Sequence, residues 1–243
     1  MKKSITIFFI LIFFTSCDES NNPFTDSRQN LKIKTESQFS LNTTTNAIEN
    51  KIYEKHFDES GNLVTIIYFN NQSKKTAQSN YTYEENKKFE TYYEFDKNGD
   101  TLNILNKNFH LDNSGNIIKI EVFDNGSLKT LSELIYNDKG NISEEKVING
   151  EGKIEEKKYE YKYNSKGNLE SISIKNDVSG EIIQKDSLIY NHNKLDMISF
   201  DINGKISQIQ KYNYDENGLL IKELNIDSNG NIVKQYIYQY TYY

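Results

Sequence analysis

From about residue 47 onward the chain alternates between polar turn segments and short segments in which every second residue is apolar or aromatic. Two segments carry tyrosine at alternate positions: Tyr159, Tyr161 and Tyr163 in one, and Tyr236, Tyr238, Tyr240 and Tyr242 in the other. A period of two places each set on one face of a β-strand. No segment in this region has the period of an amphipathic helix. The pattern therefore predicts an all-β domain.

The turns fall into two interleaved series, each repeating after about 24 to 28 residues, so that a turn occurs about every 13 residues. Many contain Asp-x-x-Gly, in which the Asp side chain accepts from backbone N–H groups. The glycine takes the left-handed conformation of a type I turn followed by a bulge. The predicted turn residues are Asp58, Gly61, Asp96, Gly99, Asp112, Gly115, Gly140, Gly167, Asp215, Gly218, Asp227 and Gly230. Tandem hairpins of this kind predict an antiparallel meander of about fifteen strands.

A single sheet of this length must cover its apolar face. Open twisted sheets rarely exceed about ten strands without curling or splitting. We therefore expect a long, twisted and curled sheet, an open half-pipe or flattened barrel, with dimerisation through the apolar face as the alternative. The last strand, from Tyr236 to Tyr243, would invite aggregation if its edge stayed bare. We expect it to fold back on the sheet or to pair with another chain.

The N-terminus is typical of an export signal. A basic start is followed by an apolar run from Ile5 to Phe14, too short to span a bilayer as a helix. Phe14-Thr15-Ser16-Cys17 resembles the lipobox of bacterial lipoproteins, and Asp18-Glu19 resembles the acidic surface-export signal of lipoproteins in Bacteroidota. The resemblance implies lipidation of Cys17 and an outer-membrane location, facing either the cell surface or the periplasm. An ordinary secretory signal is the alternative.

These observations divide the chain into three parts. We assign residues 1–16 to a lipoprotein signal peptide, 17–46 to the lipidated cysteine and a flexible tether rich in Ser, Thr and Asn, and 47–243 to the β-repeat domain. A first edge strand formed with Phe24, Ile33 and Phe39 is the alternative to a tether that is unstructured throughout.

The repeat itself resembles a known family. Tyr-x-Tyr-Asp-x-x-Gly-x-Leu, clearest at Tyr212–Leu220 and recognisable at Tyr161–Leu169 and Leu134–Ile142, is similar to the YD (Rhs-type) repeat. The similarity covers about 195 residues. In large toxins this repeat forms a β-sheet that spirals into a shell, which implies a related sheet here. The arginine common after the glycine and the toxin-core boundary motif are both absent, so toxin activity is not implied.

Composition narrows the function classes. The chain has 243 residues, a net charge of −6 and 13% aromatic residues, with one arginine, Arg28, and one cysteine. The acidic balance disfavours nucleic acid as a partner. A single cysteine excludes an internal disulfide.

Candidate catalytic and metal-binding groups are few. The carboxylate pairs Glu84-Glu85, Glu144-Glu145 and Glu155-Glu156 would point to opposite faces of a strand, and we interpret them as solvated. Asp96–Asp100 and Asp227–Asn231 lack the full frame of a calcium loop and suit hairpins instead. His56, His110 and His192 lie in different repeats, so we predict no metal, no cofactor and no catalytic site.

The tyrosine ladders are the candidate binding residues: Tyr159, Tyr161, Tyr163, Tyr236, Tyr238 and Tyr240. Packing of the sheet face is the first explanation for them. The sequence thus predicts a lipid-anchored envelope protein whose non-catalytic β-repeat scaffold binds a protein or glycan. The alternatives are a structural protein that self-assembles, with oligomers formed through edge strands, and an immunity or toxin-accessory protein related to Rhs systems.

Overall fold

A computed structural model describes residues 31–191 and 194–243. The described chain folds into sixteen strands. They are β1 (Ile33–Leu41), β2 (Ile48–Phe57), β3 (Leu63–Phe69), β4 (Lys75–Glu84), β5 (Lys87–Phe95), β6 (Thr101–Leu111), β7 (Ile117–Asp124), β8 (Ser127–Tyr136), β9 (Ile142–Asn149), β10 (Ile154–Tyr163), β11 (Leu169–Asn176), β12 (Ile182–Asn191), β13 (Lys194–Phe200), β14 (Ile206–Tyr214), β15 (Leu220–Asp227) and β16 (Ile232–Tyr242). This part of the chain has no helix long and apolar enough to cross a bilayer.

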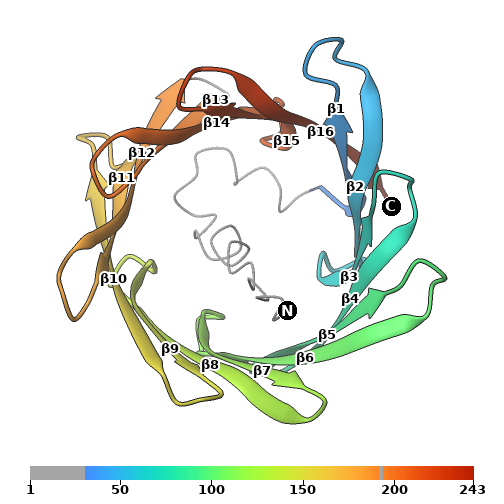
Figure 1. Cartoon of the computed structure of the whole chain (residues 1–243), viewed down its shortest axis with the longest axis horizontal. Coiled ribbons are helices and arrows are strands. Elements are labelled where there is room, and N and C mark those ends of the chain that lie inside the picture. Colours follow the sequence, from blue (N-terminus) through green and yellow to red (C-terminus); the bar gives the residue numbers. More distant parts are fainter. Residues whose placement is uncertain (1–30, 192–193) are drawn as a thin grey trace, which may run out of the picture.

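The strands form a closed antiparallel meander in which every strand pairs with its neighbours in sequence and β1 pairs with β16 (Figure 1). The predicted all-β antiparallel meander is confirmed. The predicted open half-pipe is wrong, because the barrel is closed. Closure satisfies the backbone groups of the two end strands, so neither is left as a bare edge.

The strand that completes the ring lies in the segment predicted as tether. Residues 33–41 form β1, and a turn at residues 42–47 joins it to β2. The repeat domain therefore starts before residue 47, and the boundary at 46 is corrected to a position before Ile33. Polar composition suggested a linker, yet Ile33, Phe39 and Leu41 sit in a strand paired on both sides. Cys17, the signal peptide and the rest of the predicted tether lie outside the described residues.

The turns have the chemistry expected of Asp-x-x-Gly. The N–H of Gly61 donates to the carbonyl of Asp58 at 3.0 Å. The Oδ1 atom of Asp58 accepts from the N–H groups of Ser60 at 2.9 Å and Asn62 at 2.8 Å. The predicted turn glycines have φ angles between +74° and +93°. Left-handed backbone of this kind is strained for a residue with a Cβ atom, which explains glycine at each turn.

The register of the strands defines two faces. Inward and outward side chains alternate along each strand of a barrel. Cross-strand pairing connects the residues of one face, strand by strand, from Lys55 on β2 around the barrel to Glu36 on β1, and Glu36 pairs with Lys55. Side chains on the concave face of a closed sheet converge and become the more buried set. Most buried strand residues, including Ser79, Glu90, Tyr159 and Asp186, lie on the face that contains Lys55. We assign this face to the inside and call it the inner wall.

Candidate functional site: the inner wall of the barrel

Tyrosines of the inner wall tie neighbouring strands together. Four of them donate a hydrogen bond at 2.8 Å to the first carbonyl of the preceding strand: Tyr83 to Leu63, Tyr136 to Ile117, Tyr161 to Ile142 and Tyr240 to Leu220. The acceptor follows directly after an Asp-x-x-Gly or Asn-x-x-Gly turn in every case. The hydroxyl, and not only the ring, is thus part of the repeat. We call these contacts the tyrosine latches.

The predicted ladder tyrosines all lie on the inner wall, where most of their hydroxyls contact the protein. Tyr159 donates to Glu145 at 2.7 Å, and Tyr163 accepts from the side chain of Asn141 at 2.7 Å. Tyr238 donates to Glu223 at 2.6 Å and accepts from Gln38 at 2.6 Å. These contacts stabilise the barrel, so packing accounts for most of the ladder. Tyr236 is half-buried beside Glu223 on the neighbouring strand.

Carboxylates lie among these tyrosines, and several of them contact lysines. Glu36 accepts from Lys55 and from Tyr53, both at 2.8 Å. Glu90 accepts from Ser79 at 2.6 Å and from Lys107 at 2.9 Å. Glu145 adds a third case, with the Lys157 Nζ atom at 3.4 Å. Buried charges are stable when they are paired and hydrogen-bonded, as they are here.

These charges act on neighbouring phenols. Burial, followed by the charge of Glu90, raises the pKa of Tyr68 to about 12. Burial and the charge of Glu36 raise the pKa of Tyr53 well above its usual value. The tyrosines are therefore neutral donors at physiological pH, and the wall is polar and crowded with hydrogen-bonding groups.

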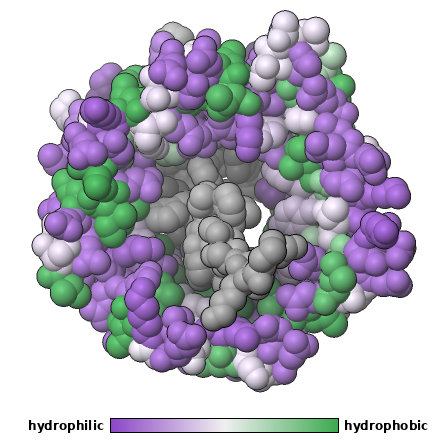
Figure 2. Space-filling view, viewed as in Figure 1, coloured by the Kyte–Doolittle hydropathy of each residue, from purple (hydrophilic) through white to green (hydrophobic). Residues whose placement is uncertain are grey.

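The outward-facing side also carries charged pairs. Lys175 contacts Glu160 at 2.6 Å, and Lys211 contacts Asp196 at 3.0 Å. His110 and Lys119 both contact Glu121, and their hydrogen bonds lower the pKa of that carboxyl to about 2. Hydrophilic residues predominate in the view down the axis, and the hydrophobic ones form no continuous ring (Figure 2). The outward-facing side of these strands is therefore charged at several positions.

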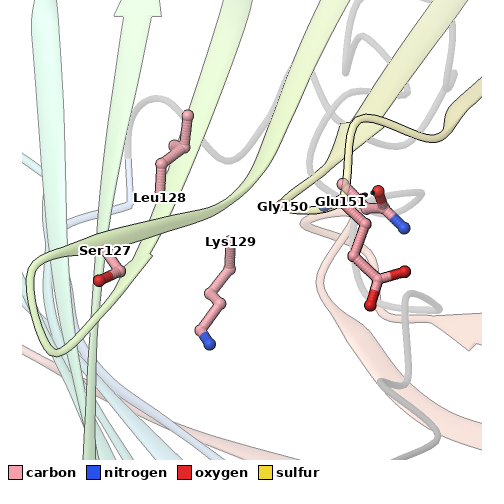
Figure 3. Close-up of a pocket in the computed structure, with 6 residues that line it drawn as sticks. Ser127, Leu128, Lys129, Gly150 and Glu151 are labelled. Atoms are coloured by element: carbon pink, nitrogen blue, oxygen red, sulfur yellow. Dashed lines mark hydrogen bonds between the residues drawn. The ribbon is translucent and has the colours of Figure 1, made fainter.

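A shallow hollow lies at the rim between the β7–β8 and β9–β10 hairpins (Figure 3). Its lining includes Leu128, Lys129, Gly150 and Glu151. Lys129 pairs with Asp124 at 3.5 Å. A Cβ atom on Gly150 would lie 3.3 Å from the carbonyl oxygen of Leu128, so glycine permits the close approach of the two hairpins. Ser127 and Asn149 complete the lining of the hollow.

The other sequence candidates are held in structural roles. Asp96 Oδ1 accepts from the N–H groups of Asn98 and Asp100, which is turn chemistry. His56 pairs with Glu54 at 2.8 Å, whereas His192 lies outside the described residues. Within residues 31–191 and 194–243, no three His, Cys, Asp or Glu residues gather closely enough to hold a metal.

One interpretation from the sequence needs correction. Glu145 was expected to be solvated, but it is 7% exposed and bonded to Tyr159. Its neighbour Glu144 does lie on the other face, as a period of two requires. The buried carboxylates of the inner wall were missed because only the register of adjacent strands brings Glu145 against Lys157.

No family model matches this chain, and no curated protein matches it. Solved structures with a similar fold include a porin-like protein from Bacteroides uniformis, with 11% identity over 86% of this chain and 98% of that chain at a TM-score of 0.36. A porin-like protein from Bacteroides vulgatus has 8% identity over 87% of this chain and 99% of that chain, with a TM-score of 0.28. The TcdB2-TccC3 chain has 10% identity over 81% of this chain but only 15% of that chain, with a TM-score of 0.25. Likeness at this level carries no conclusion about function.

Proposed function

We propose that this protein is a lipid-anchored envelope protein whose barrel is a non-catalytic binding scaffold, with its ligand surface on the inner wall. The observation that carries the proposal is the inner wall itself, where tyrosines alternate with carboxylates and lysines. Tyrosine combines an apolar ring with a hydroxyl and is favoured at protein and sugar interfaces. A protein segment or a glycan is the class of ligand that such a wall suits.

The charge on the outer side supports the same proposal. Ion pairs such as Lys175–Glu160 would be costly in a bilayer, which favours a barrel surrounded by water. Attachment to the membrane then depends on the predicted lipid at Cys17. Changing Cys17 to Ala should abolish incorporation of labelled palmitate and move the protein into the soluble fraction, and retention in the membrane would contradict the anchor.

Two adjacent residues of β9 provide a matched test of the ligand surface. Val147 faces inward between Ser132 and Glu155, whereas Ile148 faces outward between Leu131 and Ile154. Both side chains are half-buried and apolar. An arginine at either position should disturb the sheet to a similar extent, but only Val147→Arg places a long charged side chain on the inner wall.

The experiment is affinity capture from detergent-solubilised envelopes, with wild type, V147R and I148R proteins immobilised in equal amounts. Circular dichroism establishes that all three are folded. We expect a ligand retained by wild type and I148R to be lost from V147R. Equal retention by all three proteins would place any ligand elsewhere on the molecule.

A further inference from the structure

The inner wall is electrostatically uneven. Glu36, Glu90 and Glu145 each contact a lysine, at 2.8, 2.9 and 3.4 Å respectively. The strands from β12 to β16 present three further inward carboxylates, Asp186, Glu223 and the turn residue Asp227, and no described lysine forms an ion pair with any of them. We call this part of the wall the acidic sector.

Glu223 is held in place by neutral donors. The hydroxyl of Tyr238 donates to its Oε2 atom at 2.6 Å, and the side chain of Asn225 donates to its Oε1 atom at 2.9 Å. Asn225 in turn accepts from the side chain of Gln208 at 2.8 Å. These bonds orient the carboxylate without neutralising its charge.

Asp186 supplies the independent observation that points to a ligand. Its Oδ2 atom accepts from Gln184 at 2.8 Å. Its Oδ1 atom has no hydrogen-bond partner among the described residues, although the residue is only 6% exposed. A buried carboxylate oxygen without a donor is destabilising, and a bound donor would remove that cost.

Asp186 and Glu223 act on the same phenol. Tyr212 is paired with Glu223 on β15 and lies on the inner wall. Burial is the largest cause of the raised pKa of Tyr212. The negative charges of Glu223 and, to a smaller extent, Asp186 raise it further. An aromatic ring therefore lies within the electrostatic reach of two carboxylates, which is the composition of a site for organic cations.

We propose that the acidic sector binds a diamine, with one ammonium group at Asp186 and the other towards Glu223, on the same wall as Tyr212. This inference rests on the proposed function, because the ligand must reach the inner wall. An ammonium group offers three donors and no acceptor, which matches a set of carboxylate, amide and phenol oxygens. A hard metal cation would need six or more oxygen ligands, and no cluster of three acidic or histidine residues is present in the described part of the chain.

The test is calorimetric titration of the folded full-length protein with putrescine, a diamine that is protonated at neutral pH. We expect saturable binding to wild type, at least tenfold weaker binding to Asp186→Asn and Glu223→Gln, and none of the neutral 1,4-butanediol. Asp138→Asn, which makes the same change of charge on an exposed turn, is the control and should bind as wild type does. Absence of putrescine binding to wild type, or equal binding to D186N and D138N, would overturn the inference.

A second measurement separates this inference from the proposed function. Ser199 pairs with Asp186 on one side and Gln208 on the other, so it lies on the same wall. Ser199→Cys should react with a soluble maleimide in the folded protein, with the label located by peptide mass spectrometry. Labelling without putrescine binding would overturn the amine site and leave the binding wall intact. Absence of labelling would overturn the accessible inner wall itself.

Discussion

A single acceptor atom at the first turn position organises each hairpin. Asp112 Oδ1 accepts from the N–H groups of Ser114 and Asn116, at 2.8 and 2.9 Å. Asn137 makes the same two bonds in the next turn of its series, both at 3.0 Å. The turn therefore requires a side-chain oxygen that accepts these two bonds, and a neutral amide supplies it as well as a carboxylate does. The negative charge of aspartate is not required for the turn to form.

The negative charge of the turn aspartates makes the stability of the turns sensitive to acid. Hydrogen bonds from Asn62 and Asn116 lower the pKa of Asp58 and Asp112, and bonds from Lys205 and Asn231 lower the pKa of Asp201 and Asp227. A carboxyl whose pKa is lower in the folded state stabilises that state above its unfolded pKa of about 3.9. The contribution is lost as the pH falls through the folded pKa.

We therefore expect a protein with all four of these aspartates changed to asparagine to lose less stability between pH 7 and pH 3 than wild type. The measurement is the urea midpoint at both pH values. The amide keeps the acceptor and removes the titration, so the variant should keep the fold at pH 7 but lack the stability that the ionised carboxylates contribute there. An identical loss of midpoint in both proteins would show that the turn carboxylates do not carry the acid sensitivity.

At the scale of the strands, each of the four tyrosine latches joins a strand to the start of the strand before it. The period of two in the sequence places Tyr161 and Tyr159 on one face, but it does not show that the Tyr161 hydroxyl reaches the carbonyl of Ile142. That contact depends on the register between β9 and β10. A sequence pattern predicts the face of a side chain, whereas its partner depends on the neighbouring strand.

Tyr161→Phe removes one latch while it keeps the ring. We expect a loss of about 0.5–1.5 kcal/mol in the free energy of unfolding, because a buried carbonyl acceptor loses its donor. Tyr93→Phe is the control, since Tyr93 stacks on Phe95 with ring centroids 6.4 Å apart on the outward face. Denaturant unfolding measures both variants, and a larger loss for Tyr93→Phe would contradict the role of the latch.

Whether a feature can be predicted from the sequence depends on how far apart along the chain its residues lie. Strands and turns depend on residues within about a dozen positions, and Asp-x-x-Gly with alternating apolar residues is sufficient to predict them. Closure depends on β1 and β16, whose partners Gln38 and Tyr238 are 200 residues apart. The buried carboxylates likewise depend on cross-strand partners, as Glu145 does on Tyr159. Neither feature has a local signal.

For the whole molecule, closure of the barrel removes the strand edges through which copies of the chain could pair. A ring of paired strands leaves no unpaired edge in the described part of the chain, and the tyrosine-rich end strand β16 is covered by β1 along Ser40–Tyr236 to Thr35–Thr241. Self-assembly through strand edges, one of the alternatives from the sequence, would require the ring to open. The domain boundary therefore determines the oligomeric state of any shortened chain.

Two shortened chains test this conclusion. A chain of residues 31–243 keeps β1 and should be a monomer by light scattering, with a cooperative thermal transition. A chain of residues 47–243 lacks β1 and would expose the edges of β2 and β16, which include Tyr238 and its contact with Glu223. Exposed apolar edges pair with other chains, so we expect dimers or larger assemblies, or loss of the transition. A monomeric, cooperatively folded 47–243 chain would show that β1 is not needed to close the barrel. In such a chain the remaining fifteen strands would have to pair β2 with β16 or leave both edges exposed to water.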